Sequence, residues 1–231
     1  MRLHGFCMPR WWPNSQKMVH MIPLSRVVVD DDIKGAVLEV LDSGRYISGD
    51  RTREFEHRFA EFFGVRHAVS ASSGTAALYL ILRAMEIGQG DEVIVPSFSF
   101  IASATPAICL RTKPVFADIE PETYTMSPSD FRARITPRTK VVIPVHLYGH
   151  PVDMNQVTEV AEQHDIKVIE DACQAHGAQY RNRSVGSIGA ASFFSFYPSK
   201  NMTVCGDGGM VCTNDSDLAH KVRMLKDHGR T

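Results

Sequence analysis

The sequence predicts an α/β fold, a three-layer α/β/α sandwich in which a mostly parallel sheet lies between two layers of helices. Two observations lead to this prediction. Short runs that are apolar at nearly every position alternate along the chain with segments long enough for helices. Such strands are buried on both faces, and their alternation with helices is typical of a parallel sheet wound on both sides. The runs are HAVSA, DEVIVP, KPVFADI, KVVIPVHLY and IKVIEDA, followed by ASFFSF and GMVCTN.

The helices are predicted from periodicity and from the lengths of the intervening segments. In REFEHRFAEFFG, which begins at Arg53, four phenylalanines recur near i, i+4, i+7 and i+8, the spacing of one buried helical face. Gly64 is expected to close this helix, because glycine readily adopts the left-handed conformation that ends helices. Further helices are predicted over residues 75–86, 100–110, 129–135, 154–164 and 215–228.

The composition is that of an ordinary globular protein. Of the 231 residues, 44% are hydrophobic and 22% are charged, which excludes a disordered or collagen-like chain. The 25 Lys and Arg residues balance the 26 Asp and Glu residues, so the net charge of −1 creates no overall field for nucleic acid or an anionic membrane. We therefore expect partners to be recognised by local chemistry.

The cysteines and the N-terminal residues predict a cytoplasmic protein. The five cysteines form an odd set without a Cys-x-x-Cys pair, which fits neither a disulfide framework nor a thiolate zinc site. The first twenty residues lack the apolar run of a secretory signal, and no window approaches the ~18 apolar residues of a membrane span. We expect a soluble protein of the reducing cytosol.

One large domain is predicted over residues 22–231, because no internal repeat, low-complexity tract or long linker interrupts them. Residues 1–21 contain two prolines and follow neither a helical nor a strand period, so they are predicted to form an irregular extension.

The first segment that could carry chemistry is SSGTAAL, residues 72–78, which follows a predicted strand and opens a helix. Small residues there allow the backbone amides of Gly74 and Thr75 to face a phosphate at the positive end of the helix dipole. The same residues also suit a simple helix N-cap without any ligand. Both interpretations remain open on this segment alone.

The second segment is VIEDACQAHGA, in which a predicted strand ends in two adjacent carboxylates. Ligands of open parallel sheets bind beyond the carboxyl ends of the strands, which is where Asp171 falls. Glu170 and Asp171 point to opposite faces of a continuing strand, so only one of them can face the site. Alternatively, the acid caps the next helix or pairs with a nearby base.

The third segment is SFFSFYPSKN, which is followed by the glycine-rich CGDGGMV. Most lysines are solvated surface charges, and that interpretation suits most lysines here. Lys200 differs because it lies in a turn between an aromatic-rich and a glycine-rich segment. Partial desolvation there would lower the affinity of the amine for its proton, as a Schiff-base lysine requires.

Other catalytic patterns are missing from the sequence. There is no GxxxxGK[ST] loop and no GxSxG elbow, which excludes the commonest NTPase and hydrolase patterns. The histidines show no zinc-binding spacing such as H-E-x-x-H, so no metal site is expected.

Taken together, the segments resemble the DegT/DnrJ/EryC1/StrS family of pyridoxal-phosphate-dependent sugar aminotransferases, a branch of the aspartate-aminotransferase fold (fold type I). The resemblance runs from about residue 22 to the end of the chain. Nine blocks in the same order carry it: IPLSR, SGRYISGDRTREFEHRFAEFFG, SSGTAAL, GDEVIVPSFSFIASA, PVFADIEPETYTM, PVHLYGHPVDM, EDACQAHGA, SFYPSKN and GDGGMV.

The resemblance implies roles around a pyridoxal 5'-phosphate cofactor. Lys200 would bind the cofactor covalently and, once displaced by substrate, move the proton at the reacting carbon. Asp171 would pair with the pyridine nitrogen and keep it protonated. Gln174 would contact the phenolic oxygen of the ring.

The resemblance also implies how the rest of the cofactor is held. Ser195 would bind the phosphate through its hydroxyl, together with the backbone of Gly74 and Thr75. Phe100 aligns with the aromatic residue that covers the ring face, a position at which many members of the family carry a different aromatic side chain.

The reaction implied is transfer of an amino group from glutamate or glutamine to a nucleotide-linked keto-sugar, in polysaccharide or antibiotic sugar biosynthesis by a homodimer. Related enzymes that remove a hydroxyl group have histidine in place of Lys200. Since the sequence ends at Thr231, the small C-terminal domain of the family is expected to be absent. Two alternatives remain open, a non-catalytic fragment that needs a separate C-terminal piece and another pyridoxal-phosphate reaction such as elimination.

Overall fold

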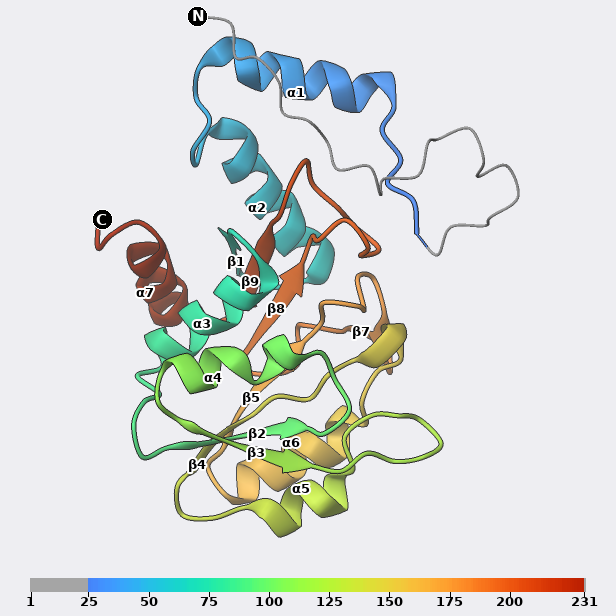
Figure 1. Cartoon of the computed structure of the whole chain (residues 1–231), viewed down its shortest axis with the longest axis vertical. Coiled ribbons are helices and arrows are strands. Elements are labelled where there is room, and N and C mark those ends of the chain that lie inside the picture. Colours follow the sequence, from blue (N-terminus) through green and yellow to red (C-terminus); the bar gives the residue numbers. More distant parts are fainter. Residues whose placement is uncertain (1–24, 231) are drawn as a thin grey trace, which may run out of the picture.

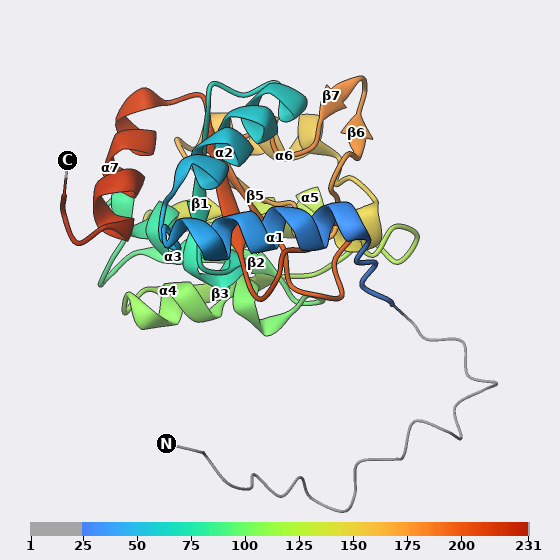
Figure 2. The same cartoon turned by 90° about the horizontal axis from the view of Figure 1, so that it is seen from above.

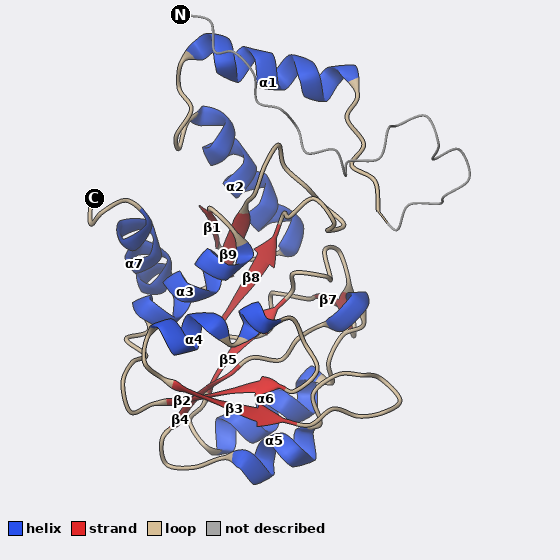
Figure 3. Ribbon diagram, in the orientation of Figure 1, coloured by secondary structure: helices blue, strands red, loops and turns tan. Residues whose placement is uncertain are grey.

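A seven-stranded sheet forms the centre of the protein, in a computed structural model that describes residues 25–230 (Figures 1 and 3). The strand order is β1-β9-β8-β5-β4-β2-β3, and β9 runs in the opposite direction to the other six strands. The predicted extension over residues 1–21 lies outside the described residues. The strands are β1 His67–Ala71, β2 Glu92–Pro96, β3 Lys113–Ala117, β4 Thr139–Val142, β5 Lys167–Asp171, β8 Ala191–Ser195 and β9 Gly209–Thr213.

Helices cover both faces of this sheet, which confirms the predicted α/β fold (Figure 2). Helices α3, α4 and α7 pack on one face, and α2, α5 and α6 pack on the other. Strand β8 shows why its sequence is apolar throughout, since Phe193 faces the first layer and Phe194 the second. The helices are α2 Asp50–Phe63, α3 Gly74–Ala84, α4 Thr105–Cys109, α5 Pro128–Arg134, α6 Met154–Gln163 and α7 Ser216–Lys226.

Two predicted elements are shorter than expected, and a proline explains each. The strand predicted over 140–148 ends at Val142, and Pro144 then offers no amide hydrogen to a sheet ladder. The helix predicted over 100–110 is divided into the 3₁₀ turn η2, Ile101–Ser103, and the short helix α4. Pro106 has no amide hydrogen, so a helix continuing through it from residue 100 would lack a hydrogen bond, whereas the first turn of a new helix, where Pro106 lies, needs none there.

Three described elements have no counterpart in the predictions. Helix α1, Asp31–Ser43, lies beyond α2 at one end of the molecule, and none of its side chains is buried (Figure 1). Strands β6, Gln179–Tyr180, and β7, Arg183–Ser184, form a small antiparallel pair. Within residues 25–230, no helix is both long and apolar enough to cross a membrane.

A buried ionic cluster joins α2, β1 and α7. Glu56 on α2 accepts hydrogen bonds from the amide of Ser70 at 2.8 Å and from its hydroxyl at 2.7 Å. Its carboxylate also pairs with Arg223 at 2.7 Å and Lys226 at 3.1 Å, both on α7. Burial acts to raise the pKa of Glu56, but these partners outweigh it and lower the pKa below its usual value. The cluster therefore ties the start and the end of the described chain together.

Replacing Glu56 by alanine should lower the free energy of unfolding by about 2 kcal/mol, because two cations and a buried amide lose their common partner. Urea denaturation monitored by circular dichroism measures this loss. Glu61→Ala on the same helix is the matched control, since Glu61 is exposed and its removal should cost less than about 0.5 kcal/mol. Equal losses in the two variants would contradict a stabilising role of the cluster.

Candidate active site

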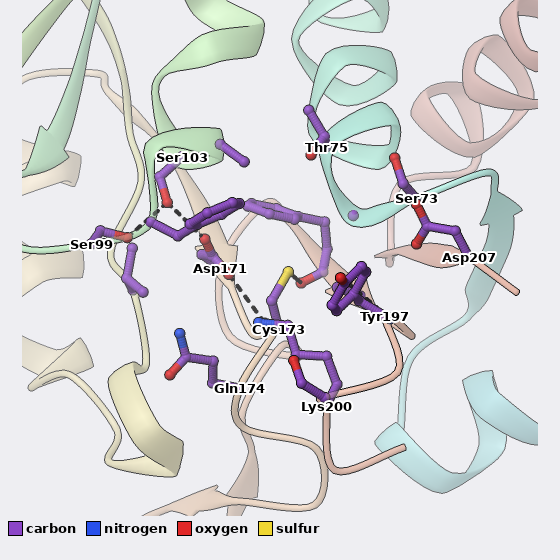
Figure 4. A pocket seen from close by; sticks show the side chains of 17 residues that line it. Ser73, Thr75, Ser99, Ser103, Asp171, Cys173, Gln174, Tyr197, Lys200 and Asp207 are labelled. Atoms are coloured by element: carbon purple, nitrogen blue, oxygen red, sulfur yellow. Dashed lines mark hydrogen bonds between the residues drawn. The ribbon is translucent and has the colours of Figure 1, made fainter. Parts of the chain in front are cut away.

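A cavity of about 310 Å³ opens at the carboxyl ends of the central strands (Figure 4). Its volume lies at the lower end of the range of ~300–1,000 Å³ found for small-molecule sites. All seven residues that the sequence singles out line this cavity: Gly74, Thr75, Phe100, Asp171, Gln174, Ser195 and Lys200. Seven further lining residues with polar groups were not singled out: Ser73, Ser99, Ser103, Cys173, Tyr197, Ser199 and Asp207.

The turn from β1 into α3 forms one wall of the cavity. Ser73 caps the helix by accepting a hydrogen bond from the amide of Ala76 at 3.1 Å. The amides of Gly74 and Thr75 begin the helix, where backbone N–H groups have no intrahelical acceptor. A Cβ atom at Gly74 would lie 2.8 Å from Cβ of Ser195, so only glycine lets the helix start so close to the end of β8. The N-cap interpretation and the anion-binding interpretation are therefore compatible.

Asp171 ends β5 and faces the same cavity. Its Oδ2 accepts a hydrogen bond from the hydroxyl of Ser103 at 3.0 Å, and its Oδ1 accepts one from the amide of Cys173 at 3.1 Å. Burial raises the pKa of Asp171, and the hydrogen bonds from Cys173 and Ser103 oppose this effect without cancelling it. A buried carboxylate of this kind would be stabilised by a cationic N–H donor placed in the cavity.

Glu170 points to the other face of the sheet, as the alternation of strand side chains requires. Its carboxylate is fully buried and accepts hydrogen bonds from the amides of Gly186, Ile188 and Gly189 at 2.7–2.9 Å. The ring nitrogen Nε2 of His146 lies 3.1 Å away. Burial acts to raise the pKa of Glu170, but the hydrogen bonds from His146 and the backbone outweigh it and lower the pKa.

Gln174 is oriented by the backbone of a neighbouring turn. Its side-chain Oε1 accepts a hydrogen bond from the amide of Tyr148 at 2.9 Å. This leaves the amide nitrogen of Gln174 as the group available to the cavity, where it can donate to an oxygen atom (Figure 4). Tyr148 has a φ of 53°, a left-handed conformation that is uncommon for a residue with a side chain.

Lys200 reaches the cavity from the segment between β8 and β9. The amide of Lys200 donates to the carbonyl of Tyr197 at 2.8 Å, which closes a turn after the strand. The Lys200 side chain is partly exposed and lies on the same side of the cavity as Cys173 and Tyr197 (Figure 4). Burial raises the pKa of the Cys173 thiol well above its usual value, so this neighbour remains uncharged. Phe100 also lines the cavity and is 68% exposed.

His176 has a ring that packs against two aromatic side chains behind this cavity. The ring centroids of Phe194 and Phe196 lie 5.3 and 5.8 Å away. Within the described part of the chain, neither buried ring nitrogen of His176 has a hydrogen-bond partner. Burial, reinforced by the charge of Lys200, lowers the pKa of His176 to about 4.

A comparison with known protein families identifies the family to which the chain belongs. Residues 28–231 match the DegT/DnrJ/EryC1/StrS aminotransferase family. The chain belongs to this family. The match spans every strand of the sheet and every residue of the cavity, and it confirms the resemblance inferred from the nine sequence blocks.

Two curated members of the family are similar to the chain over most of its length. The UDP-N-acetyl-3-dehydro-alpha-D-glucosamine 3-aminotransferase of Acidithiobacillus ferrooxidans is 47% identical over 210 residues, which cover 91% of this chain and 56% of that protein. The dTDP-3-amino-3,4,6-trideoxy-alpha-D-glucose transaminase of Streptomyces venezuelae is 46% identical, over 84% of this chain and 51% of that protein. The chain thus spans about half the length of the curated relatives it matches.

Solved structures of family members share the fold. An aminotransferase from Psychrobacter cryohalolentis superposes with a TM-score of 0.86 at 42% identity, covering 88% of this chain and 52% of that chain. NtdA from Bacillus subtilis, solved with its cofactor PMP bound, gives a TM-score of 0.82 at 35% identity, covering 87% of this chain and 46% of that chain. The fold of the described residues is therefore the same as that of the matching half of these known aminotransferases.

The lowered pKa of His176, whose half-buried ring has both nitrogens shielded from solvent, makes stability depend on pH. In the unfolded chain a histidine takes up a proton below a pH of about 6.5, whereas the folded chain does so only near pH 4. The folded state therefore loses stability as the pH falls from about 6.5 towards 4. His176→Leu should remove this contribution. The melting temperature of the variant minus that of the wild type should therefore be higher at about pH 5 than at about pH 8.

Thermal melts at both pH values check this prediction. His220→Leu on α7 is the control, because the side chain of His220 is exposed and its replacement should not alter the pH dependence. A difference between His176→Leu and wild type that stays the same at the two pH values would show that the ring titrates normally.

Proposed function

We propose that the chain is the cofactor-binding large domain, residues 22–231, of a pyridoxal-phosphate-dependent enzyme that transfers an amino group to a nucleotide-linked keto-sugar. The observation that carries this proposal is the meeting of three groups in one cavity. A helix N-terminus, a buried carboxylate and an amine, contributed by Gly74, Asp171 and Lys200, line the same 310 Å³. In that order, these groups are suited to bind the phosphate, the ring nitrogen and the aldehyde carbon of the cofactor.

The cavity combines donors for a phosphate with a buried carboxylate that can accept a hydrogen bond, and a general anion site would not need this carboxylate. Gly74 and Ser195 approach so closely that a Cβ at position 74 would clash, which leaves amides and a hydroxyl to donate to a phosphate. Asp171 is buried, has one donor on each oxygen and retains acceptor capacity towards the cavity. When bound, pyridoxal phosphate supplies an electron sink for the carbon from which a proton is removed.

Lys200 is proposed to act twice. Its amine would hold the cofactor covalently, which requires a deprotonated amine beside an uncharged neighbour such as Cys173. After substrate displaces the amine, Lys200 remains beside the reacting carbon and would accept its proton and return it. Because the amine is held in place, no base has to diffuse in.

Three other side chains are proposed to orient the ring. Asp171 would accept the ring N–H and keep it protonated, since a buried carboxylate stabilises an adjacent cation. Gln174 would donate its amide N–H to the phenolic oxygen, because its Oε1 is occupied by the amide of Tyr148. Phe100 would cover one ring face with its exposed aromatic surface.

The proposed substrates and assembly rest on the relatives. Two members that are 46–47% identical are named for amino transfer on UDP-linked and dTDP-linked sugars, which supports a nucleotide-linked keto-sugar as the acceptor. We further propose glutamate or glutamine as the donor, a homodimer as the active assembly, and the cytoplasm as its location. Polysaccharide or antibiotic sugar biosynthesis would use the product.

Covalent attachment at Lys200 is the decisive test of the proposed cofactor. Adding pyridoxal phosphate should change the absorption spectrum of the cofactor, and borohydride reduction of the carbon–nitrogen double bond should fix its mass on the peptide that contains Lys200. Lys200→Ala should lose both signals, whereas Lys140→Ala, which removes an exposed lysine, should keep them. Labelling spread over several lysines, unaffected by Lys200→Ala, would overturn the proposal.

Amino transfer separates the proposed reaction from the alternatives. The loaded wild type should convert glutamate to its keto acid, and a nucleotide-linked keto-sugar should then restore the starting spectrum with the amino group in the sugar. Asp171→Asn should lower the rate of both steps at least about a hundredfold, because the ring nitrogen loses its anion. Release of ammonia without amine transfer would indicate elimination instead, and binding without turnover would indicate a non-catalytic fragment.

A further inference from the structure

Two serines of one turn form a hydrogen-bonded chain that ends on Asp171. The hydroxyl of Ser103 donates to Oδ2 of Asp171 at 3.0 Å. The hydroxyl oxygens of Ser99 and Ser103 lie 2.9 Å apart. Both serines line the cavity, and Ser103 is only 3% exposed (Figure 4).

The direction of this chain follows from the number of protons available. A serine hydroxyl has one proton to donate and can accept in return. Because Ser103 gives its proton to the carboxylate, the contact with Ser99 must be one in which Ser99 donates to Ser103. Donation from Ser99 polarises the hydroxyl of Ser103 and strengthens its bond to Asp171. One hydroxyl proton thus reaches the buried carboxylate directly, and a second supports it through the oxygen of Ser103.

The 3₁₀ turn η2 explains how both serines reach Asp171. Ser99 precedes η2, Ile101–Ser103, and Ser103 is its last residue, so the two serines are four positions apart. The amide of Ser103 donates to the carbonyl of Phe100 at 3.0 Å within this turn. The turn brings the two hydroxyls together on the cavity side. Phe100, which lies between them in the sequence, keeps an exposed ring at the rim.

The serine hydroxyls also stabilise the carboxylate of Asp171 against the effect of burial. Asp171 is 7% exposed, and burial disfavours its charged form. The amide of Cys173 supplies one donor, to Oδ1, which leaves Oδ2 to the serine chain. A hydrogen bond to an ionised group contributes more than one between neutral groups, so the loss of Ser103 would weaken both the charge and the orientation of the carboxylate.

We propose that Ser103, supported by Ser99, is a positioning residue that keeps the Asp171 carboxylate ionised and aimed at the ring nitrogen of the cofactor. This inference rests on the proposed function, because it assigns Asp171 a protonated ring nitrogen as its partner. Neither serine has to touch the cofactor for this role. Their contribution passes through Asp171 alone, and that makes it separable from the contacts of Gly74 and Ser195 with the phosphate.

The test compares two ligands that differ only at the ring nitrogen. Pyridoxal phosphate and an analogue with a C–H group in place of that nitrogen are titrated into the full chain, and each dissociation constant is measured from ligand absorbance. The wild type should prefer pyridoxal phosphate. Ser103→Ala should reduce this preference about tenfold while leaving the affinity for the analogue unchanged, and Ser99→Ala should reduce it less.

Two variants keep the result independent of folding. Ser103→Thr retains the hydroxyl and should restore the preference, although its extra methyl group is buried. Ser97→Ala removes an exposed hydroxyl from the same segment and should leave both affinities as in the wild type. Melting temperatures of all the variants identify any loss of folded protein.

The outcomes separate this inference from the proposed function. Equal losses of affinity for both ligands in Ser103→Ala, or an unchanged preference, would overturn the role of Ser103 while the cofactor proposal stands. A wild type that binds both ligands equally well would overturn the pairing of Asp171 with the ring nitrogen, and the role of Ser103 with it. A wild type that binds neither ligand would contradict the proposed cofactor itself.

Discussion

The site depends on the end of β5, where two adjacent carboxylates are buried on opposite faces of the sheet. Glu170 is held by three backbone amides of the segment 186–189 and by His146, so the strand cannot rotate or slip without leaving a charge unpaired. A one-residue slip would exchange the two carboxylates. The network around Glu170 therefore fixes which carboxylate, Asp171, faces the cavity.

Close backbone packing sets the other wall of the cavity. A Cβ at Gly74 would meet Ser195, and a Cβ at Gly209 would lie 2.4 Å from the carbonyl of Ser73. Strands β8 and β9 thus press against the start of α3, and this contact places a hydroxyl beside the free amides of a helix. Lys200 lies in the connection between those two strands, so its amine lines the same cavity as the groups proposed to bind phosphate.

The sequence predicts the sheet and the seven candidate residues because these depend on local patterns. Buried strands need continuous apolar runs, and the strand end at Asp171 and the turn at Gly74 are visible in the order of residues. The serine chain was not predicted, since Ser103 and Asp171 are 68 positions apart and only the folded chain brings them together. Helix α1 was also missed, although apolar residues recur at helical spacing from Ile33 to Leu41. None of its residues is buried in the described chain. The environment of His176 was missed for another reason. Buried polar atoms usually have hydrogen-bond partners, and within the described residues the two buried ring nitrogens of His176 have none.

Three departures from ordinary packing and backbone geometry lie around the cavity. Burial raises the pKa of Asp171 and lowers the pKa of His176. Tyr148 adopts a left-handed conformation in which its amide donates to Gln174. Each costs stability that the ordinary core must offset. The hydrogen bonds to Asp171 and Gln174 orient both side chains before any ligand arrives. Donors and acceptors fixed in this way need not reorganise during a reaction, which is how a protein lowers a barrier electrostatically. The strain is therefore best understood as the consequence of building a preorganised site on a rigid sheet.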